Sequence, residues 1–363
     1  MKLSVVLSIA VISAAMAIAG AAQETLPLIR GLSRSDLLQY RGTDGQVLNA
    51  KTPEEWAVRR ADVLKAFHLV AGPLPGADRR CDLDVKIDEE VDCGTYVRRA
   101  ISYASEPGSR TTAFLCIPKT ALEGKPARGV LCLHPTENNI GYKVVVGLGG
   151  KPHRQYASEL AERGMVTISP SYVQLAQYQP DLKALGYQSG TMKAIWDNMR
   201  ALDLMDALPF VIHGRYAAIG HSLGGHNAIF TAVHDDRIQV IVSSCGFDSF
   251  LDYYGGKITG WTQERYMPKM ADYLGRAQDV PFDFYELVAC LAPRKFYVNA
   301  PLRDANFHWD SVDRIVLAAR KVYALHGAGE NLRVAHPDSE HDFPDAERFA
   351  AYDWIQAGLN AER

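Results

Sequence analysis

Short apolar runs alternate with amphipathic segments over the second part of the chain. The intervening segments, such as 190–208 and 311–327, carry apolar residues at helical spacing. Strands separated by helices favour a mostly parallel sheet covered on both faces. The runs are each short enough for one buried strand: VLCLH, MVTIS, YAAIG, QVIVSSC, KFYVNA and LRVAH. The pattern therefore predicts the α/β class.

The first part of the chain has a different rhythm. Residues 51–72 predict a helix that Thr52 caps and Gly72 ends. Three alternating segments follow, and they predict antiparallel strands at one edge of the sheet: LDVKIDEEV, TYVRRAISYAS and TTAFLCIPK. We expect an N-terminal helical extension over 23–80 and one large α/β domain over 81–363.

An irregular aromatic insertion interrupts the alternation at 247–292. It leaves from the C-terminal end of a predicted strand, where α/β proteins bind ligands. We therefore expect a wall or lid over a site, the alternative being a separately packed surface excursion. Two of its aromatic residues, Trp261 and Tyr266, are predicted to contact substrate. The insertion is rich in large rings: Tyr253, Tyr254, Trp261, Tyr266 and Tyr285.

The first 22 residues have the layout of a secretory signal peptide. One lysine precedes an apolar run that ends in small residues, and cleavage is expected just before Ala22 or Gln23. An uncleaved membrane anchor is the alternative. No later segment is long and apolar enough to span a bilayer. We expect a periplasmic or extracellular protein without stable membrane association.

Charge and cysteine content indicate which binding partners, disulfides and metal sites to expect. The net charge is −3 and no basic run is present, which argues against nucleic acid. Export permits disulfides, and Cys81 and Cys93, which flank a predicted strand, are the predicted pair. Cys116 and Cys132 lie in apolar runs and are expected to be buried thiols. No Cys/His spacing suggests a structural metal. The oligomeric state stays open.

The stretch AAIGHSLGGH, at 217–226, places Ser222 between glycines. A strand pattern precedes the serine and a helix pattern follows it, as a G-x-S-x-G corner requires. Such a corner exposes the hydroxyl and directs backbone N–H groups beside it. We predict that Ser222 is a nucleophile, the alternative being a close-packed turn whose serine only caps the helix.

A serine nucleophile needs a base and an acid that orients the base. His341 lies in the loop after the last strand and is preferred to His336, which falls at the end of that strand. Asp304 lies in the loop after the penultimate strand. Asp310 and Asp313 fall in the next helix, where a carboxylate suits the N-terminus. The predicted triad is thus completed by Asp304 and His341.

The oxyanion of acyl transfer needs two donors. One is the backbone N–H of Leu223, directly after the serine. The other is expected from Thr136, because Pro135 before it has no N–H. His221, directly before the serine, is expected to contact substrate. No cofactor is required, because these residues supply nucleophile, acid and base.

From about position 95 onward the chain resembles the α/β-hydrolase superfamily, and within it the dienelactone hydrolase and acetyl xylan esterase-like branches. The resemblance implies a serine esterase with the roles assigned above to Ser222, Asp304, His341, Leu223 and Thr136. The motifs occur in the family's order: LCLHP, YASELAERGMVTISPSY, IWDNMRALDLMDALP, GHSLGGHNA, LAPRKFYVNAPLRDANF and SEHDFP.

Three departures from these families narrow the prediction. The elbow serine separates the chain from true dienelactone hydrolases, whose nucleophile is usually cysteine. The chain has His134-Pro135 where many members have His-Gly. IWDNMRALDLMDALP also resembles glucuronoyl esterases, but those carry Arg where this chain has Leu223, which argues against a uronate ester.

The function predicted is an exported serine esterase for small-acyl or carbohydrate-linked esters. The aromatic insertion motivates the carbohydrate, since flat rings suit sugars, although the same rings would equally form a lid core. A serine peptidase for short peptides would share the triad. A non-catalytic protein that uses the fold to hold a ligand is the alternative from another class.

Overall fold

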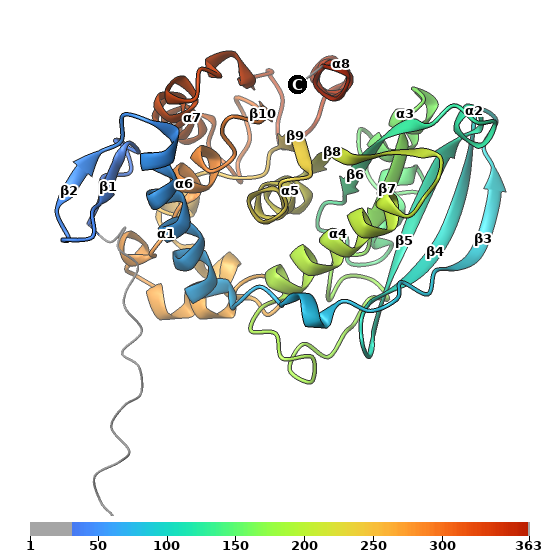
Figure 1. Cartoon of the computed structure of the whole chain (residues 1–363), viewed down its shortest axis with the longest axis horizontal. Coiled ribbons are helices and arrows are strands. Elements are labelled where there is room, and N and C mark those ends of the chain that lie inside the picture. Colours follow the sequence, from blue (N-terminus) through green and yellow to red (C-terminus); the bar gives the residue numbers. More distant parts are fainter. Residues whose placement is uncertain (1–30, 362–363) are drawn as a thin grey trace, which may run out of the picture.

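A nine-stranded sheet forms the centre of the computed structural model, which describes residues 31–361 (Figure 1). Its order is β11-β10-β9-β8-β6-β7-β5-β4-β3. The strands from β6 to β11 pair in parallel, whereas β5, β4 and β3 add antiparallel strands at one edge, as predicted. The strands are β3 (Lys86–Asp92), β4 (Tyr96–Glu106), β5 (Ser109–Pro118), β6 (Ala127–Leu133), β7 (Val166–Pro170), β8 (Val211–His221), β9 (Ile238–Ser244), β10 (Lys295–Asn299) and β11 (Leu332–Ala335).

Helices cover both faces of the sheet. Neighbouring residues along a strand point to opposite faces, so each central strand contributes side chains to both cores. Along β6, Val130 and Cys132 join the core beneath α3 and α8, whereas Leu131 and Leu133 join the core beneath α4 and α5. Figure 1 shows these two pairs of helices on opposite sides of the sheet. The helices are α1 (Pro53–Ala71), α2 (Lys119–Leu122), α3 (Tyr156–Glu162), α4 (Gly190–Asp206), α5 (Leu223–His234), α6 (Phe284–Ala289), α7 (Trp309–Leu325) and α8 (Asp345–Asn360).

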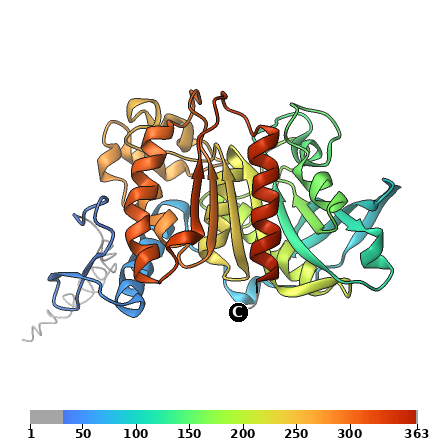
Figure 2. The same ribbon diagram turned by 90° about the horizontal axis from the view of Figure 1, so that it is seen from above.

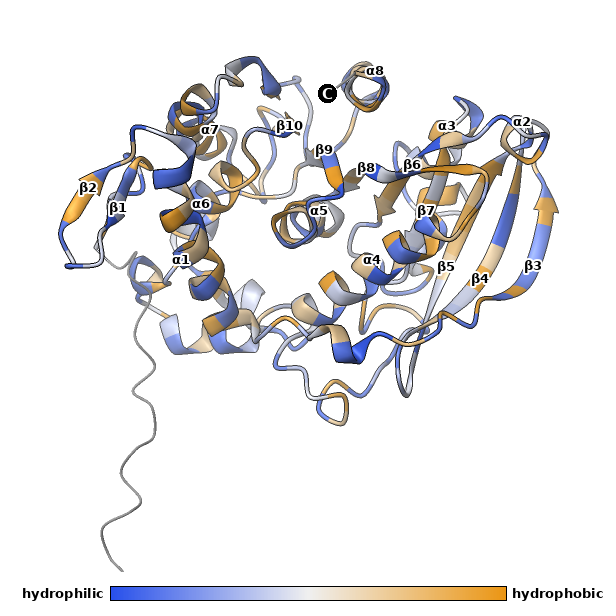
Figure 3. Ribbon diagram, viewed as in Figure 1, coloured by the Kyte–Doolittle hydropathy of each residue, from blue (hydrophilic) through white to orange (hydrophobic). Residues whose placement is uncertain are grey.

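Hydropathy follows this layering (Figure 3). The central strands are largely apolar, as buried parallel strands are. The edge strand β3 has the sequence KIDEEVD and is largely exposed. Charged residues on an edge strand oppose pairing with another chain. The charged residues of β3 explain why the sheet ends at this strand.

The N-terminal part packs beside the insertion. Helix α1 begins after Thr52, whose side chain accepts the Glu55 N–H, and ends at Gly72 with φ +91°, as predicted. A two-stranded sheet of β1 (Gln39–Arg41) and β2 (Val47–Asn49) precedes it and was not predicted. The indole N–H of Trp56 donates to the Leu37 carbonyl at 2.9 Å and ties α1 to this part of the chain.

The predicted signal peptide, 1–22, lies outside the described residues. From residue 31 to residue 361, no helix combines the length and the hydropathy needed to cross a membrane.

The predicted Cys81–Cys93 disulfide is wrong, since all six cysteines are free. The seven residues of β3 lie between the two cysteines. An extended strand of that length separates its ends by roughly 20 Å, whereas the Cα atoms of a disulfide lie within about 7 Å. Cys116 and Cys132 are buried, as predicted.

The insertion consists of short helices between β9 and β10. Four 3-10 helices, at Tyr253–Gly255, Ile258–Thr262, Pro268–Tyr273 and Ala277–Asp279, precede α6. Figure 2 shows the insertion and the loops after β10 and β11 at the same end of the sheet. The residues predicted to do chemistry come from that end.

Candidate active site

Ser222 occupies a strained corner between β8 and α5. Its backbone has φ +55° and ψ −120°, a region that residues with a side chain rarely adopt. An added Cβ on Gly220 would lie 2.2 Å from the Gly224 backbone, and one on Gly224 would lie 2.0 Å from the Leu133 carbonyl oxygen. The serine side chain makes no capping hydrogen bond to α5. Helix capping therefore does not account for the serine.

Asp304 and His341 are joined directly. Nδ1 of His341 lies 3.0 Å from Oδ1 and 2.9 Å from Oδ2 of Asp304. The carboxylate also accepts the backbone N–H groups of Asn306, at 2.8 Å, and Phe307, at 3.2 Å. Because Nδ1 donates to the carboxylate, Nε2 is the nitrogen left for a serine proton. His341 and Ser222 line the same cavity.

The other sequence candidates are engaged elsewhere. Nδ1 of His336 donates to the Ala300 carbonyl at 2.7 Å, and Nε2 lies 2.8 Å from the Asp313 carboxylate. Asp310 pairs with Arg314 one turn further along α7. These sequence candidates therefore form the pairs His336–Asp313 and His341–Asp304, and the pair of His341 is the one that shares a cavity with Ser222.

The loop that carries His341 is fixed at Asp342. Arg154 donates to the Asp342 carboxylate at 2.6 Å, and the Asn299 side-chain amide donates to its carbonyl at 2.9 Å. The Cys245 thiol lies 3.2 Å from the same carbonyl. Burial opposes ionisation of Asp342, but hydrogen bonds from Arg154 and His153 outweigh it and lower the pKa of the carboxyl. The sequence did not reveal this anchor.

His221 lies behind His341 and is almost completely buried. Its Nδ1 is 3.0 Å from the Ser244 hydroxyl, and its ring meets the His341 ring edge-on at 4.8 Å between centroids. Burial, with Arg154 and His341 nearby, holds the pKa of His221 well below its usual value. The ring is therefore neutral, and it reaches the cavity that also contains Ser222 and His341.

Among the described residues, His221, Cys245 and His341 form one group whose ligand atoms lie within 4.8 Å of one another. Metal binding there would require the thiolate. Burial, and then the neighbouring Asp304 carboxylate, hold the pKa of the Cys245 thiol well above its usual value. The environment therefore favours a protonated thiol, and Asp304 already engages His341.

The predicted oxyanion donors lie beside the serine. Leu223 is the first residue of α5, so its N–H has no acceptor within the helix. Thr136 lines the cavity with Ser222, and its hydroxyl lies 3.1 Å from that of Tyr266. His134 fixes the start of this loop, because its Nε2 accepts the Tyr172 N–H at 2.9 Å. Burial lowers the pKa of His134 to about 4, which keeps that acceptor neutral.

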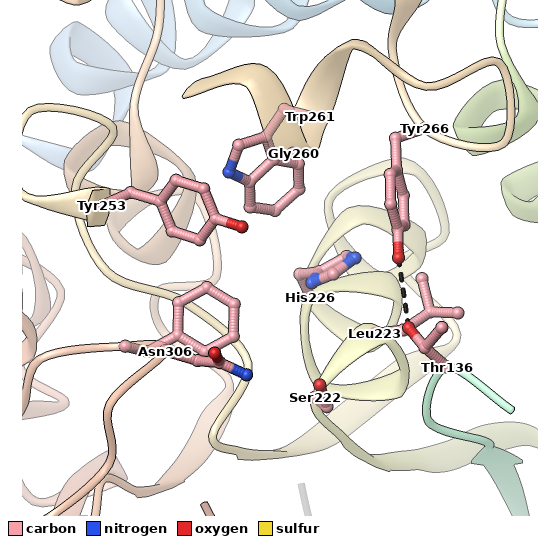
Figure 4. A pocket seen from close by; sticks show the side chains of 10 residues that line it. Thr136, Ser222, Leu223, His226, Tyr253, Gly260, Trp261, Tyr266 and Asn306 are labelled. Carbon is pink, nitrogen blue, oxygen red and sulfur yellow. Dashed lines mark hydrogen bonds between the residues drawn. The ribbon is translucent and has the colours of Figure 1, made fainter. Parts of the chain in front are cut away.

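Two cavities meet at Ser222. The first, here called the aromatic cavity, has a volume of about 130 Å³ (Figure 4). The second, here called the polar cavity, has a volume of about 270 Å³ and contains His341. The aromatic cavity is lined by Thr136, Ser222, Leu223, His226, Tyr253, Gly260, Trp261, Tyr266, Asn306 and Phe307.

The aromatic cavity contains both predicted insertion residues, Trp261 and Tyr266. It also contains His226, Tyr253 and Asn306, which were not predicted as site residues. A signal for His226 was present in the sequence, because residues four apart on a helix are neighbours and His226 follows Ser222 by four. Asn306 lies in the same loop as Asp304. Only the fold brings Tyr253 to the cavity.

Comparison with known proteins supports the fold. No family model matches the chain. YtaP of Bacillus subtilis (strain 168), whose name describes it as a hydrolase, is 31% identical over 170 residues, which are 46% of this chain and 53% of that protein. The match thus spans about half the length of that relative.

Solved structures of esterases superpose on most of the chain. A glucuronoyl esterase from Solibacter usitatus gives a TM-score of 0.74 at 18% identity, covering 90% of this chain and 98% of that one. An acetyl xylan esterase from Paenibacillus sp. R4 gives a TM-score of 0.58 at 17% identity, covering 83% and 94%. With the sheet order described above, these superpositions identify the α/β-hydrolase fold.

Proposed function

We propose that this protein is a serine hydrolase that cleaves carboxylic esters through Ser222, His341 and Asp304. The observation that carries the proposal is the Asp304–His341 pair, whose histidine lines one cavity with a serine on a strained corner. The superposed structures are those of esterases, which supports the reaction class. The fold alone does not establish it.

Each of these residues has a role in the steps of acyl transfer. His341 Nε2 takes the Ser222 proton as Oγ bonds to the ester carbonyl carbon, and the oxyanion is held by the N–H groups of Leu223 and Thr136. The bond to the alcohol oxygen then breaks, and the proton on His341 passes to that oxygen. Water, deprotonated by His341, releases the acid from the acyl-enzyme. Asp304 keeps the imidazole oriented throughout.

Carbohydrate-linked esters are the substrate class that we favour. Aromatic rings suit sugar faces, and the aromatic cavity presents Tyr253, Trp261 and Tyr266 next to the serine. A uronate ester is the second candidate, because a glucuronoyl esterase superposes well. Against it stands Leu223 at the elbow position where the resemblance to glucuronoyl esterases implies Arg. The side chain of Leu223 is instead packed in an apolar cluster with Tyr172 and Val173.

Export is part of the proposal and rests on residues 1–22. Cell fractionation and N-terminal sequencing of the secreted form test it. A mature N-terminus at Ala22 or Gln23 is expected, and a chain retained in the cytoplasm with an intact N-terminus would contradict it.

Hydrolysis of 4-nitrophenyl acetate and butyrate tests the esterase. We expect wild-type turnover and losses of about 10³-fold or more in kcat for Ser222→Ala and His341→Ala. His336→Ala, which disrupts the His336–Asp313 pair, is the matched control and should keep near-wild-type activity. A folded but inert wild type, or an active Ser222→Ala, overturns the proposal. Faster cleavage of the matching nitroanilides would favour a peptidase instead.

A further inference from the structure

A pair of hydroxyl groups lies beside the predicted oxyanion site. The hydroxyl oxygens of Thr136 and Tyr266 are 3.1 Å apart, and Figure 4 shows both on the same side of Ser222 as Leu223. No other residue between 31 and 361 forms a hydrogen bond with either hydroxyl. Thr136 is exposed, so a substrate can reach its side chain.

The pair carries one hydrogen more than its mutual bond uses. Each hydroxyl has one hydrogen to donate, and each oxygen can also accept. Burial raises the pKa of Tyr266, so the phenol keeps its hydrogen at neutral pH. One hydrogen forms the bond between the two oxygens, and the other is left to donate to a third group. Since no described residue accepts it, a substrate oxygen can take that hydrogen in the complex.

The Thr136 hydroxyl belongs to the region where the reacting carbonyl must lie. Ser222 bonds to the carbonyl carbon, so that carbon lies at the point where the aromatic and polar cavities meet. Thr136, Ser222 and Asn306 line both cavities, whereas Tyr266 lines the aromatic cavity and not the polar one. Of the two hydroxyls, that of Thr136 is therefore the one placed to donate to the carbonyl oxygen.

We propose that the Thr136 hydroxyl is a third donor to the oxyanion and that Tyr266 orients this hydroxyl. The phenol donates to Thr136 Oγ1, which leaves the Thr136 hydrogen to donate to the same oxygen as the backbone N–H of that residue. The negative charge on the oxygen develops only during the reaction, so this bond is strongest in the transition state. The inference rests on the proposed function and adds a side-chain donor to the two backbone donors.

The insertion is well fixed where it supplies Tyr266. The Tyr266 carbonyl accepts the Thr191 N–H at 3.1 Å, at the start of α4. The Tyr266 ring packs near that of Trp261, with 5.9 Å between the ring centroids. Arg265 donates to the side chain of Asn138 at 3.0 Å and so joins the insertion to the loop after β6 a second time. These contacts hold the phenol in place, as the orientation of a neighbouring hydroxyl requires.

Variants that remove one hydroxyl at a time test the proposal with 4-nitrophenyl butyrate. Thr136→Val keeps the backbone N–H and the size of the side chain, and kcat/KM should fall about 10²-fold, as for the loss of one oxyanion donor. Tyr266→Phe lets the Thr136 hydroxyl rotate and should cost less, roughly tenfold. Thr136→Ser restores the hydroxyl and should keep most of the wild-type activity. The double variant Thr136→Val/Tyr266→Phe should be no slower than Thr136→Val, because both changes act through one hydroxyl.

A pair of ketones distinguishes an effect on the oxyanion from an effect on the shape of the cavity. Ser222 adds to propyl trifluoromethyl ketone, whose acyl part matches butyrate, and the adduct carries an oxyanion. Propyl methyl ketone has a similar shape but adds to a hydroxyl far less readily. The ratio of the two inhibition constants should change in Thr136→Val and Tyr266→Phe by the factors seen in kcat/KM. Equal weakening of both ketones would indicate a structural effect and overturn the proposal.

The Thr111–Tyr178 pair provides the matched control. The two hydroxyl oxygens are also 3.1 Å apart, and neither residue lines the aromatic or the polar cavity. Thr111→Val should therefore leave kcat/KM and the ketone ratio at their wild-type values. If Tyr266→Phe does not fold, Thr136→Val and Thr136→Ser decide the question, because Thr136 is exposed.

The outcomes separate this inference from the esterase proposal. If the wild type is active and Ser222→Ala is inert, an unchanged kcat/KM in Thr136→Val overturns the hydroxyl donor alone. A Thr136→Ser variant as slow as Thr136→Val does the same, and so does a larger loss in Tyr266→Phe than in Thr136→Val. A folded wild type that hydrolyses no ester overturns both proposals.

Discussion

Oδ2 of Asp304 lies 2.9 Å from Nδ1 of His341, and Oδ1 of the same carboxylate accepts two backbone N–H groups. The carboxylate is thereby held on one side by its own loop and aimed on the other at the imidazole. Asp304→Asn would keep the size of the side chain but present an amide N–H to His341. We therefore expect a loss of about 10⁴-fold in kcat, because the imidazole takes the wrong tautomer.

The His336–Asp313 pair supplies the control for that variant. Asp313→Asn changes the partner of His336 in the same chemical way. Steady-state kinetics with 4-nitrophenyl acetate should show near-wild-type activity for Asp313→Asn. Equal losses in the two variants would mean that the effect is structural, and no loss in Asp304→Asn would remove Asp304 from the mechanism.

Arg154 should affect catalysis without contacting the reacting atoms. Its guanidinium holds the Asp342 carboxylate at 2.6 Å and also donates to the His341 carbonyl at 3.3 Å. Arg154→Leu would free the loop, and a displacement of about 1 Å at a reacting group costs on the order of 10²-fold. We expect kcat to fall by roughly that factor, and steady-state kinetics with 4-nitrophenyl acetate checks it.

The control for Arg154 is another arginine that pairs with the loop of His341. Arg303 pairs with Asp338, and both side chains are exposed. Arg303→Ala should leave kcat near wild type, because exposed ion pairs contribute about 0–1 kcal/mol. If Arg303→Ala lowers kcat as much as Arg154→Leu does, the buried anchor has no special role.

Gly224 should tolerate no side chain. An added Cβ would lie 2.0 Å from the Leu133 carbonyl oxygen, so the start of α5 must move away from β6. Gly224→Ala is expected to cost about 1–3 kcal/mol in the free energy of unfolding, and the shifted Ser222 should lose most activity. Gly329→Ala is the control, since an added Cβ there meets no atom within 4 Å. Urea unfolding of both variants checks the expectation.

Much of the fold could be predicted because the signal was periodic. Each predicted central strand was an apolar run, and the antiparallel edge showed its alternation over 83–119. The strands β1 and β2 have three residues each, too few for a period to appear. The disulfide prediction was wrong because it used composition and export alone. It did not consider that the strand between the two cysteines keeps them too far apart to bond.

Part of the candidate site could also be predicted from the strand pattern. Ser222, Asp304 and His341 each follow a recognisable strand, and parallel strands bring such loops to one end of the sheet. Their roles remain predictions until variants are measured. Arg154 and Asp342 are 188 positions apart, so only the tertiary structure pairs them.

Acid should weaken the contact between α1 and the helix that follows Ser222. Nε2 of His68 lies 2.9 Å from Nε2 of His234, and Nδ1 of His234 donates to the Phe230 carbonyl. The first contact therefore needs a neutral His234 whose Nε2 accepts from His68. Burial, with His68 and Arg60 nearby, lowers the pKa of His234 to about 4, and burial also lowers that of His68.

The sign follows from the proton that the unfolded chain binds. An unfolded histidine titrates near 6.5, so below that pH the unfolded state holds the proton that folded His234 refuses. Stability from His234 is complete above about pH 6.5 and is lost as the pH falls toward 4. Between pH 7.5 and 5 the loss is about 2 kcal/mol. Urea unfolding at pH 7.5 and at pH 5 measures the fall in the free energy of unfolding between the two. We expect that fall to be about 2 kcal/mol smaller in His234→Gln than in wild type. His213→Gln, at an exposed position, should keep the wild-type drop, and equal drops in wild type and His234→Gln would show that His234 does not couple stability to pH.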